Sequence, residues 1–286
     1  MNDFAGQLGE KHDAVLSSVI ADGDALAMFS CYDFGTATAV LSAAEQVGRS
    51  VGLLIPPVTI LASGGERLVT AIIDLAGSAQ VSVVTQLDHC TDAALAQRAI
   101  VLGVNSVMAD GSRLGDSENA RFVKGMVDAA QERSVTVEAE LGRIEGREDL
   151  LESVNHGRLT DPGLVQPFVS ESGCDVLAIS VGNVHGAYSG EPRLEWGLLE
   201  RLVEVSPVPL SLHGTSGLSE ADLTRALRMG VRKFNVNTEL RRGFFDVLER
   251  SGAVFAEKLD VHGLCRTQFD ETQRIARHWL TVAAGV

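Results

Sequence analysis

Histidine and acidic residues lie directly after several apolar, β-prone runs of this 286-residue chain. Asp88 and His89 follow the run Val81–Leu87, and His185 and His213 follow two later runs of the same kind. Three neutral imidazoles with an open fourth position form a catalytic zinc site, whereas a structural zinc site uses four protein ligands. The pattern therefore predicts a catalytic metal centre, provided that the ends of these runs meet in space.

Each of these histidines also has a simpler interpretation. A single histidine at a strand end is more often a hydrogen-bonded structural residue than a metal ligand. Three of them at the ends of three predicted strands favour a joint site. The remaining histidines fall in helices or a loop and are expected to be surface or packing residues: His12, His156, His262 and His278.

Glycine follows two of the candidate ligands, as His185-Gly186 and His213-Gly214. Glycine leaves backbone N–H groups open to a ligand, and Ser219 is expected to cap a helix that begins nearby. Backbone N–H groups at a helix N-terminus bind phosphate, and phosphate sites recur after strands seven and eight of α/β barrels. A Gly/Ser cluster taken alone is more often an ordinary turn.

The elements that must position these residues follow a regular alternation. Val-rich runs without polar alternation are typical of strands buried on both faces, as in a parallel sheet covered by helices. These runs alternate with helical patterns, and the composition does not change along the chain. The alternation predicts an α/β fold, specifically a (β/α)8 TIM barrel that forms a single domain over residues 1–286. Extra C-terminal helices are expected in residues 244–286. The strands are expected near residues 25–30, 51–55, 81–87, 106–109, 136–141, 176–180, 210–212 and 233–236.

Composition narrows the class of protein. Lys and Arg number 24 against 38 Asp and Glu, and the resulting net charge of −14 argues against a nucleic-acid or anionic-membrane partner. The 4 cysteines are scattered without a C-x-x-C pair, so neither a disulfide framework nor a zinc ribbon is indicated. No apolar run approaches the length of a transmembrane helix. We therefore expect a cytoplasmic protein.

Six segments cover most of the chain in order: QLDHC, SVMADGS, VEAELGRIEGREDL, LAISVGNVHGAYSGEPRL, PLSLHGTSGL and KFNVNTELR. Together they resemble the class II, metal-dependent fructose-bisphosphate and tagatose-bisphosphate aldolases. The resemblance implies a lyase of carbohydrate metabolism that cleaves a ketose (bis)phosphate into dihydroxyacetone phosphate and an aldehyde, or condenses these two, through a zinc-stabilised enediolate.

The same resemblance implies a role for each candidate residue. His89, His185 and His213 would bind the catalytic Zn²⁺. Asp88 would handle the proton of the aldehyde-derived oxygen, Glu148 would move the carbon-bound proton of dihydroxyacetone phosphate, and Asn235 would contact the enediolate. The other matching positions are Asp110 and Glu140 for a second divalent ion, and Gly186, Gly214, Ser216 and Thr238 for phosphate. A monovalent cation near the phosphate and a homodimer or homotetramer are also implied.

Several stretches depart from the family pattern. Gln86 stands where the family usually has histidine, Ser30 where it has asparagine, and the run Ile55–Thr59 lacks the usual Ser or Thr with glycine. The glycine pair of the loop after strand five is changed to Glu145-Gly146. Because these changes cluster on the aldehyde side, we expect an aldehyde other than glyceraldehyde 3-phosphate.

Two other functions remain open at this point. A Schiff-base aldolase would use a lysine at a strand end, and only Lys233 is placed for that role. A barrel that binds a sugar phosphate without turning it over, as a regulator or scaffold, is the second. Asp88 and Glu148 favour a catalyst over this second function, whereas the altered substrate loops favour the binding protein.

Overall fold

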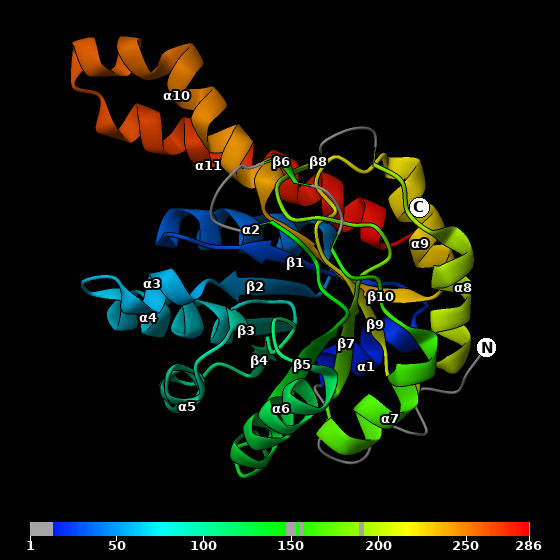
Figure 1. The fold of residues 1–286 in the computed structure, drawn as a ribbon. Helices are drawn as coiled ribbons and strands as arrows, with labels where there is room; N and C mark the ends of the chain where they lie inside the picture. Colours follow the sequence, from blue (N-terminus) through cyan, green and yellow to red (C-terminus); the bar gives the residue numbers. More distant parts are fainter. Residues whose placement is uncertain (1–13, 147–152, 155–156, 189–191, 286) are drawn as a thin grey trace.

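Eight parallel strands close into a barrel that is surrounded by helices (Figure 1). This computed structural model describes residues 14–146, 153–154, 157–188 and 192–285. The order around the barrel is β1-β10-β9-β7-β5-β4-β3-β2, which confirms the predicted (β/α)8 fold. The strands are β1 (Leu26–Ser30), β2 (Val51–Ile55), β3 (Val83–Cys90), β4 (Ser106–Ala109), β5 (Thr136–Leu141), β7 (Val176–Ile179), β9 (Leu210–Leu212) and β10 (Val231–Val236).

The helices begin and end at residues suited to those positions. Asp92 accepts a hydrogen bond from the backbone N–H of Ala94 at 2.8 Å at the start of one helix, and Ser219 caps another as expected. Gly48 and Gly103 end helices in the left-handed conformation. The helices are α1 (Ala14–Ala21), α2 (Phe34–Val47), α3 (Pro57–Leu61), α4 (Gly65–Gly77), α5 (Ala93–Leu102), α6 (Asp116–Gln131), α7 (Pro162–Ser172), α8 (Trp196–Val205), α9 (Glu220–Met229), α10 (Thr238–Lys258) and α11 (Val261–Ala283).

The barrel interior is apolar at the N-terminal ends of the strands. Helix α1 contributes Leu16 and Val19 to this layer, which also holds Leu26, Met28, Leu54, Val84 and Val176. Gly52 is required here, because a Cβ at this position would lie 1.8 Å from the sulfur of Met28. The filled lower layer leaves only the C-terminal ends of the strands for a ligand.

The third strand differs from its prediction. It was expected to end at Leu87, but β3 continues through Asp88 and His89 to Cys90. The strand stays paired because its register with β4 shifts between Leu87 and Cys90, and His89 adopts a φ of +42° within this irregularity. A bulge of this kind re-aims side chains at a barrel rim, which an apolar pattern does not reveal.

Three small elements were not predicted. Helix α3 begins one residue after β2, within the run Ile55–Thr59, for which no helix was expected. Strands β6 (Ser153–Val154) and β8 (Ala187–Tyr188) form a two-stranded parallel sheet between the two long loops. Strands of two residues carry too few side chains to produce a recognisable pattern.

The expected C-terminal helices are α10 and α11, which form a hairpin that projects from the barrel (Figure 1). The last part of α11 packs along α2, and the carbonyl of Ala283 accepts a hydrogen bond from the backbone N–H of Ala25 at 3.0 Å. The projecting part exposes apolar side chains, including 62% of Phe245 and 85% of Leu259. Within the described ranges, no helix is both long and apolar enough to cross a bilayer.

We expect one fast-reacting thiol per native chain. Cys31, Cys90 and Cys174 are buried and Cys265 is exposed. Burial raises the pKa of all three buried thiols, that of Cys174 to about 12, so their reactive thiolate forms are scarce at about pH 8. Titration with DTNB should therefore give one equivalent quickly and four only after unfolding. Two or more fast equivalents in the native protein would contradict the burial.

Candidate active site

Three histidines that lie in or follow separate strands converge at the C-terminal mouth of the barrel. His89 lies in β3, His185 in the loop after β7, and His213 directly after β9. Their ring centroids are 4.7 Å apart for His89 and His185 and 4.9 Å apart for His89 and His213. One nitrogen from each ring lies within 4.8 Å of the others, and His89 Nε2 is 3.0 Å from His213 Nδ1. Two imidazole ligands of one tetrahedral zinc ion lie about 3.4 Å apart, so the three rings fit one metal ion.

A buried carboxylate orients His213. Its Nε2 is 2.9 Å from Glu138 Oε1, and the ionised carboxylate only accepts, so Nε2 carries the proton and Nδ1 faces the other histidines. Glu138 Oε2 accepts from Lys233 Nζ at 2.8 Å and from Gln86 Nε2 at 2.9 Å. Burial alone would raise the pKa of Glu138, but the charges of Lys233 and His213 hold it well below its usual range.

A second carboxylate orients His89. Its Nδ1 is 2.9 Å from Asp110 Oδ2, while the Ser112 backbone N–H and hydroxyl donate to Asp110 Oδ1 at 3.1 and 2.7 Å. A histidine that contacts a carboxylate through one nitrogen presents the other to a metal, as is common at zinc sites. Burial lowers the pKa of His89, but Asp88 and Asp110 outweigh it and raise the pKa well above the usual value.

His185 differs from His89 in its electrostatics. Burial and then the positive charges of His89 and His213 lower the pKa of His185 well below its usual value. The ring is therefore neutral, which is the form that binds a metal. Its backbone N–H donates to the carbonyl of Glu145 at 2.8 Å, which joins the loop after β7 to the loop after β5.

The surroundings of Glu140 indicate independently that the barrel mouth suits a cation. Its Oε1 accepts from the backbone N–H of Ile144 at 2.8 Å, and its buried Oε2 has no hydrogen-bond partner among the described residues. Burial and then the charge of Asp110 raise the pKa of Glu140 to about 8. His89, Asp110 and Glu140 form a second set of potential ligands within 4.8 Å. The two sets meet at His89, whose Nε2 faces His213 and whose Nδ1 faces Asp110.

Asp88 and Asn235 face the histidines from inside the barrel. Asn235 Nδ2 lies 3.5 Å from Asp88 Oδ1 and 3.4 Å from His213 Nδ1. Lys233 Nζ donates to Asn235 Oδ1 at 2.9 Å, which turns the amide nitrogen toward the site. Lys233 is thus bound to Glu138 and Asn235 together, an arrangement that fits a structural cation better than a Schiff-base nucleophile.

The expected phosphate contacts lie at the ends of β7, β9 and β10. Gly186 and Gly214 have φ values of +85° and +60°, and a Cβ on Gly214 would lie 2.2 Å from the carbonyl oxygen of Val184. Ser216 Oγ donates to Glu239 Oε2 at 2.9 Å, and Thr238 begins α10. Glycine is required at position 214 because the two loops approach closely there.

One expected catalytic residue, Glu148, lies outside the described residues, as do His12 and His156. His262 and His278 are exposed surface residues as predicted. The structure therefore brings together every described residue of the expected metal set, and it places Asp88 and Asn235, which are expected to act in catalysis, beside them.

Three residues that hold the site together have no role in the sequence-based expectations. Glu138 orients His213, and Ser112 holds Asp110. Asn183 donates to the carbonyls of His213 at 3.0 Å and Ile179 at 3.2 Å. The role of Glu138 could have been predicted, because Glu138 lies two residues before Glu140 and both side chains therefore lie on the same face of the strand.

The family model described as fructose-bisphosphate aldolase class II matches residues 10–285. The chain belongs to this family. The protein YdjI of Escherichia coli K12 is 35% identical over 217 residues, which cover 76% of this chain and 78% of YdjI. This family is typically zinc-dependent, and the barrel mouth of this chain holds a group of three histidines that could bind a metal ion.

Solved structures of aldolases share the fold. The crystal structure of the YdjI aldolase has a TM-score of 0.84 and 28% identity, and covers 95% of this chain and 96% of YdjI. A putative fructose-1,6-bisphosphate aldolase from Coccidioides immitis has a TM-score of 0.87 and 26% identity, with 95% of each chain covered. Fructose-bisphosphate aldolase from Campylobacter jejuni, at 19% identity and a TM-score of 0.76 over 95% of this chain and 93% of that one, shows the fold alone.

Replacing Glu138 should weaken both the fold and the metal centre of this aldolase. Glu138→Gln leaves the buried Lys233 without its counter-charge, which we expect to lower the free energy of unfolding by about 3–5 kcal/mol. Loss of the orienting carboxylate should lower zinc affinity by about 10–100-fold. Urea unfolding and zinc titration of the folded protein measure the two effects.

Glu271→Gln is the matched control, since it breaks an ion pair between the half-buried Glu271 and the exposed Arg274 at the surface. Surface pairs contribute about 0–1 kcal/mol. Equal stability and equal zinc affinity in the two variants would show that Glu138 does not hold the site.

Proposed function

We propose that this chain is a zinc-dependent aldolase that reversibly cleaves a ketose (bis)phosphate into dihydroxyacetone phosphate and an aldehyde. The convergence of three imidazoles on one point, with Asp88 beside them, carries this proposal. His89, His185 and His213 would hold the ion. A bound zinc ion supplies a positive charge that stabilises an enediolate without a Schiff base.

The protein groups then have separate tasks in cleavage. Asp88 takes the proton from the hydroxyl group on the carbon that becomes the aldehyde, and the electrons of the breaking C–C bond pass to the ketose half as its enediolate. The amide nitrogen of Asn235 donates a hydrogen bond to that enediolate, in the orientation set by Lys233. Glu148 returns a proton to the enediolate carbon, which yields dihydroxyacetone phosphate.

The loops after β7, β9 and β10 suit the phosphate of the ketone half. Gly186 and Gly214 would contribute backbone to this phosphate site, and Ser216 and Thr238 would contribute hydroxyls. Asp110 and Glu140 would hold a second divalent ion or, with the zinc ion on the histidines, orient His89. We further propose that residues 1–286 act as one domain in the cytoplasm, a compartment that suits four free thiols.

The aldehyde side supports a specificity other than glyceraldehyde 3-phosphate. Gln86 replaces a histidine and bridges Glu138 to Ser106, whose hydroxyl donates to Gln86 Oε1 at 3.0 Å. Pro56 and Pro57 take the place of hydroxyl and glycine groups after β2. These residues present fewer hydrogen-bond donors to the aldehyde than the family pattern does. Cleavage of fructose or tagatose bisphosphate with the efficiency of a dedicated aldolase would contradict this specificity.

Removal of the metal should abolish turnover. We expect the purified chain to release dihydroxyacetone phosphate from ketose 1-phosphates, to lose this activity after dialysis against EDTA, and to regain it with zinc. His213→Ala should be inactive, whereas His278→Ala, which changes an exposed histidine, should behave as the wild type. Full turnover after EDTA, or covalent trapping by borohydride with substrate, would favour the Schiff-base alternative instead.

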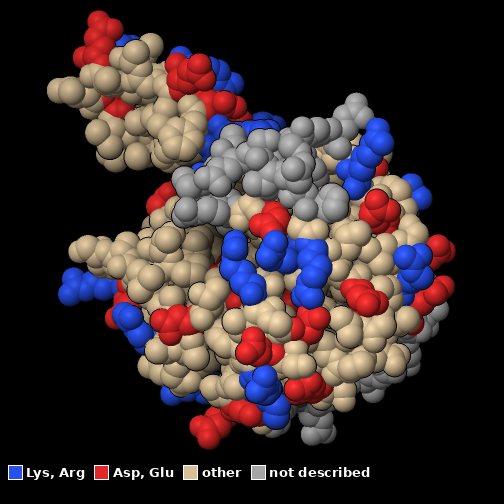
Figure 2. All heavy atoms as spheres, in the orientation of Figure 1, with Lys and Arg blue, Asp and Glu red and all other residues tan. Residues whose placement is uncertain are grey.

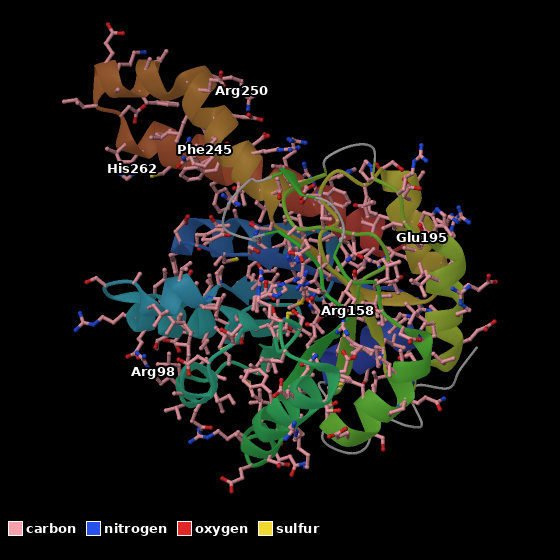
Figure 3. All side chains as sticks on the ribbon, in the orientation of Figure 1. Arg98, Arg158, Glu195, Phe245, Arg250 and His262 are labelled. Atoms are coloured by element: carbon pink, nitrogen blue, oxygen red, sulfur yellow. The ribbon has the colours of Figure 1, made fainter. Side chains whose placement is uncertain are left out.

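We also propose that the chain forms a homodimer or homotetramer through the hairpin of α10 and α11. The hairpin exposes 52% of Val254 and 69% of Val261 in addition to Phe245 and Leu259, and Figure 3 shows Phe245 on α10, toward the base of the hairpin. Apolar side chains gathered on a projecting element mark a protein-binding surface.

Light scattering after gel filtration tests this assembly. The wild type should have two or four times the chain mass of 30.4 kDa, and Phe245→Glu combined with Val254→Glu should shift it toward the monomer with an unchanged circular dichroism spectrum. Val101→Glu is the control, because Val101 is 58% exposed on α5. A wild-type monomer would contradict the proposal.

A further inference from the structure

Five polar side chains inside the barrel form a closed ring of hydrogen bonds that includes Asp88. Lys233 Nζ donates to Glu138 Oε2 at 2.8 Å and to Asn235 Oδ1 at 2.9 Å. Gln86 Nε2 donates to the same oxygen of Glu138 at 2.9 Å and to Asp88 Oδ1 at 3.4 Å. Asn235 Nδ2, 3.5 Å from Asp88 Oδ1, closes the ring. Two separate routes of hydrogen bonds therefore connect Lys233 to Asp88.

The ring lies beneath the surface of the molecule. Figure 2 shows charged side chains of both signs spread over one face of the protein, whereas no side chain of the ring is more than 3% exposed. A buried polar or charged group is strongly unfavourable unless it is hydrogen-bonded. The positions of these five side chains are therefore set by their contacts with one another and not by solvent.

Gln86 is the member of the ring that lies between the two carboxyl groups. Its amide nitrogen has two hydrogens, one for Glu138 and one for Asp88. Its amide oxygen accepts from the hydroxyl of Ser106 at 3.0 Å, and Ser106 pairs in register with Gln86 on the neighbouring strand β4. The hydroxyl thus fixes the amide group with its nitrogen toward the carboxyl groups.

The two oxygens of Asp88 differ in their contacts. Both hydrogen bonds that Asp88 accepts from described residues end on Oδ1, one from Gln86 and one from Asn235. No described residue donates to Oδ2, so this oxygen is available to the hydroxyl group of a ketose. The amide nitrogen of Asn235 also lies 3.4 Å from His213 Nδ1 and turns to the enediolate in the proposed mechanism. Gln86 is therefore the donor that can hold Asp88 throughout cleavage.

We propose that Gln86 is a positioning residue for the proton transfer of Asp88. By holding Oδ1, it fixes the rotation of the carboxyl group and directs Oδ2 toward the hydroxyl of the carbon that becomes the aldehyde. Ser106 acts through Gln86 by fixing the orientation of the amide group. Displacement of a reacting group by about 1 Å can lower a rate about 100-fold. This inference rests on the proposed aldolase function, in which Asp88 takes that proton.

Two reactions of the zinc-loaded enzyme separate a positioning role from a structural one. Cleavage of the ketose 1-phosphate that the wild type uses best requires Asp88. Exchange of the carbon-bound proton of dihydroxyacetone phosphate with deuterated water requires Glu148 and the metal, but no proton transfer by Asp88. In Gln86→Leu we expect kcat for cleavage to fall about 10–100-fold with KM and the exchange rate changed less than about twofold. Unchanged cleavage, or an equal fall of both rates, would overturn the assignment.

Two further variants make the result independent of one substitution. Ser106→Ala removes a single hydrogen bond to Gln86 and should lower kcat for cleavage about 2–10-fold without an effect on exchange. Gln86→His provides an N–H donor again and should recover part of the loss caused by Gln86→Leu.

Thr136→Val is the matched control for Ser106→Ala. Thr136 pairs in register with Ser106 from the other side, on β5, and its buried hydroxyl has no hydrogen-bond partner among the described residues. This variant should match the wild type in both reactions. A loss of cleavage as large as that of Ser106→Ala would overturn the role of Ser106.

Crystal structures of the metal-free proteins separate this inference from the aldolase function. We expect Oδ1 of Asp88 to move by more than about 1 Å in Gln86→Leu and to stay in place in Thr136→Val. An unmoved Asp88 in Gln86→Leu would overturn the inference even where cleavage is lost. If Asp88 moves but the wild type neither cleaves a ketose phosphate nor exchanges the proton of dihydroxyacetone phosphate, the aldolase function fails and the contact of Gln86 with Asp88 stands.

Discussion

The buried carboxylate of Glu138 is the contact on which the site depends. It joins β5 to His213 after β9, to Lys233 in β10 and to Gln86 in β3, and all four side chains are almost fully removed from solvent. An isolated buried carboxylate is strongly unfavourable, and here its charge is balanced by an ammonium group and satisfied by three donors. The same contacts fix which nitrogen of His213 faces the other histidines. The contacts that stabilise the closed barrel are therefore the same contacts that orient the candidate ligand His213.

The chemistry of the mouth is divided between two sides of the barrel. Glycine-rich loops after β7 and β9 approach each other so closely that Gly214 has no room for a side chain. The opposite side is built from prolines and arginines around a cavity. One side is built from glycine-rich backbone, where we propose that the phosphate binds, and the other carries side chains that differ from the family pattern. A division of this kind lets a family keep one half of the reaction constant while the other half varies.

Much of this architecture follows from the sequence, because a buried parallel strand has a strong apolar pattern. The runs that became β2, β4, β5 and β9 were predicted with their observed bounds, and the class of aldolase followed from six motifs. The bulge in β3 was not predicted, since an apolar pattern does not encode a register shift. The contacts of Glu138 and Asn183 were also missed, because each depends on strands brought together only by closure of the barrel. Glu148 lies outside the described residues, so its predicted role stays a prediction.

The left-handed backbone at His89 restricts how the candidate metal site can change during evolution. A φ of +42° is unfavourable for most side chains and worst for β-branched ones, while Asn, Asp and His tolerate it best. A replacement at this position must therefore satisfy the backbone as well as the metal. Aspartate meets both requirements, and it would exchange a nitrogen donor for oxygen, which favours harder ions such as manganese or magnesium. The backbone conformation thus permits replacement of His89 by aspartate, an oxygen ligand, and disfavours replacement by valine or threonine.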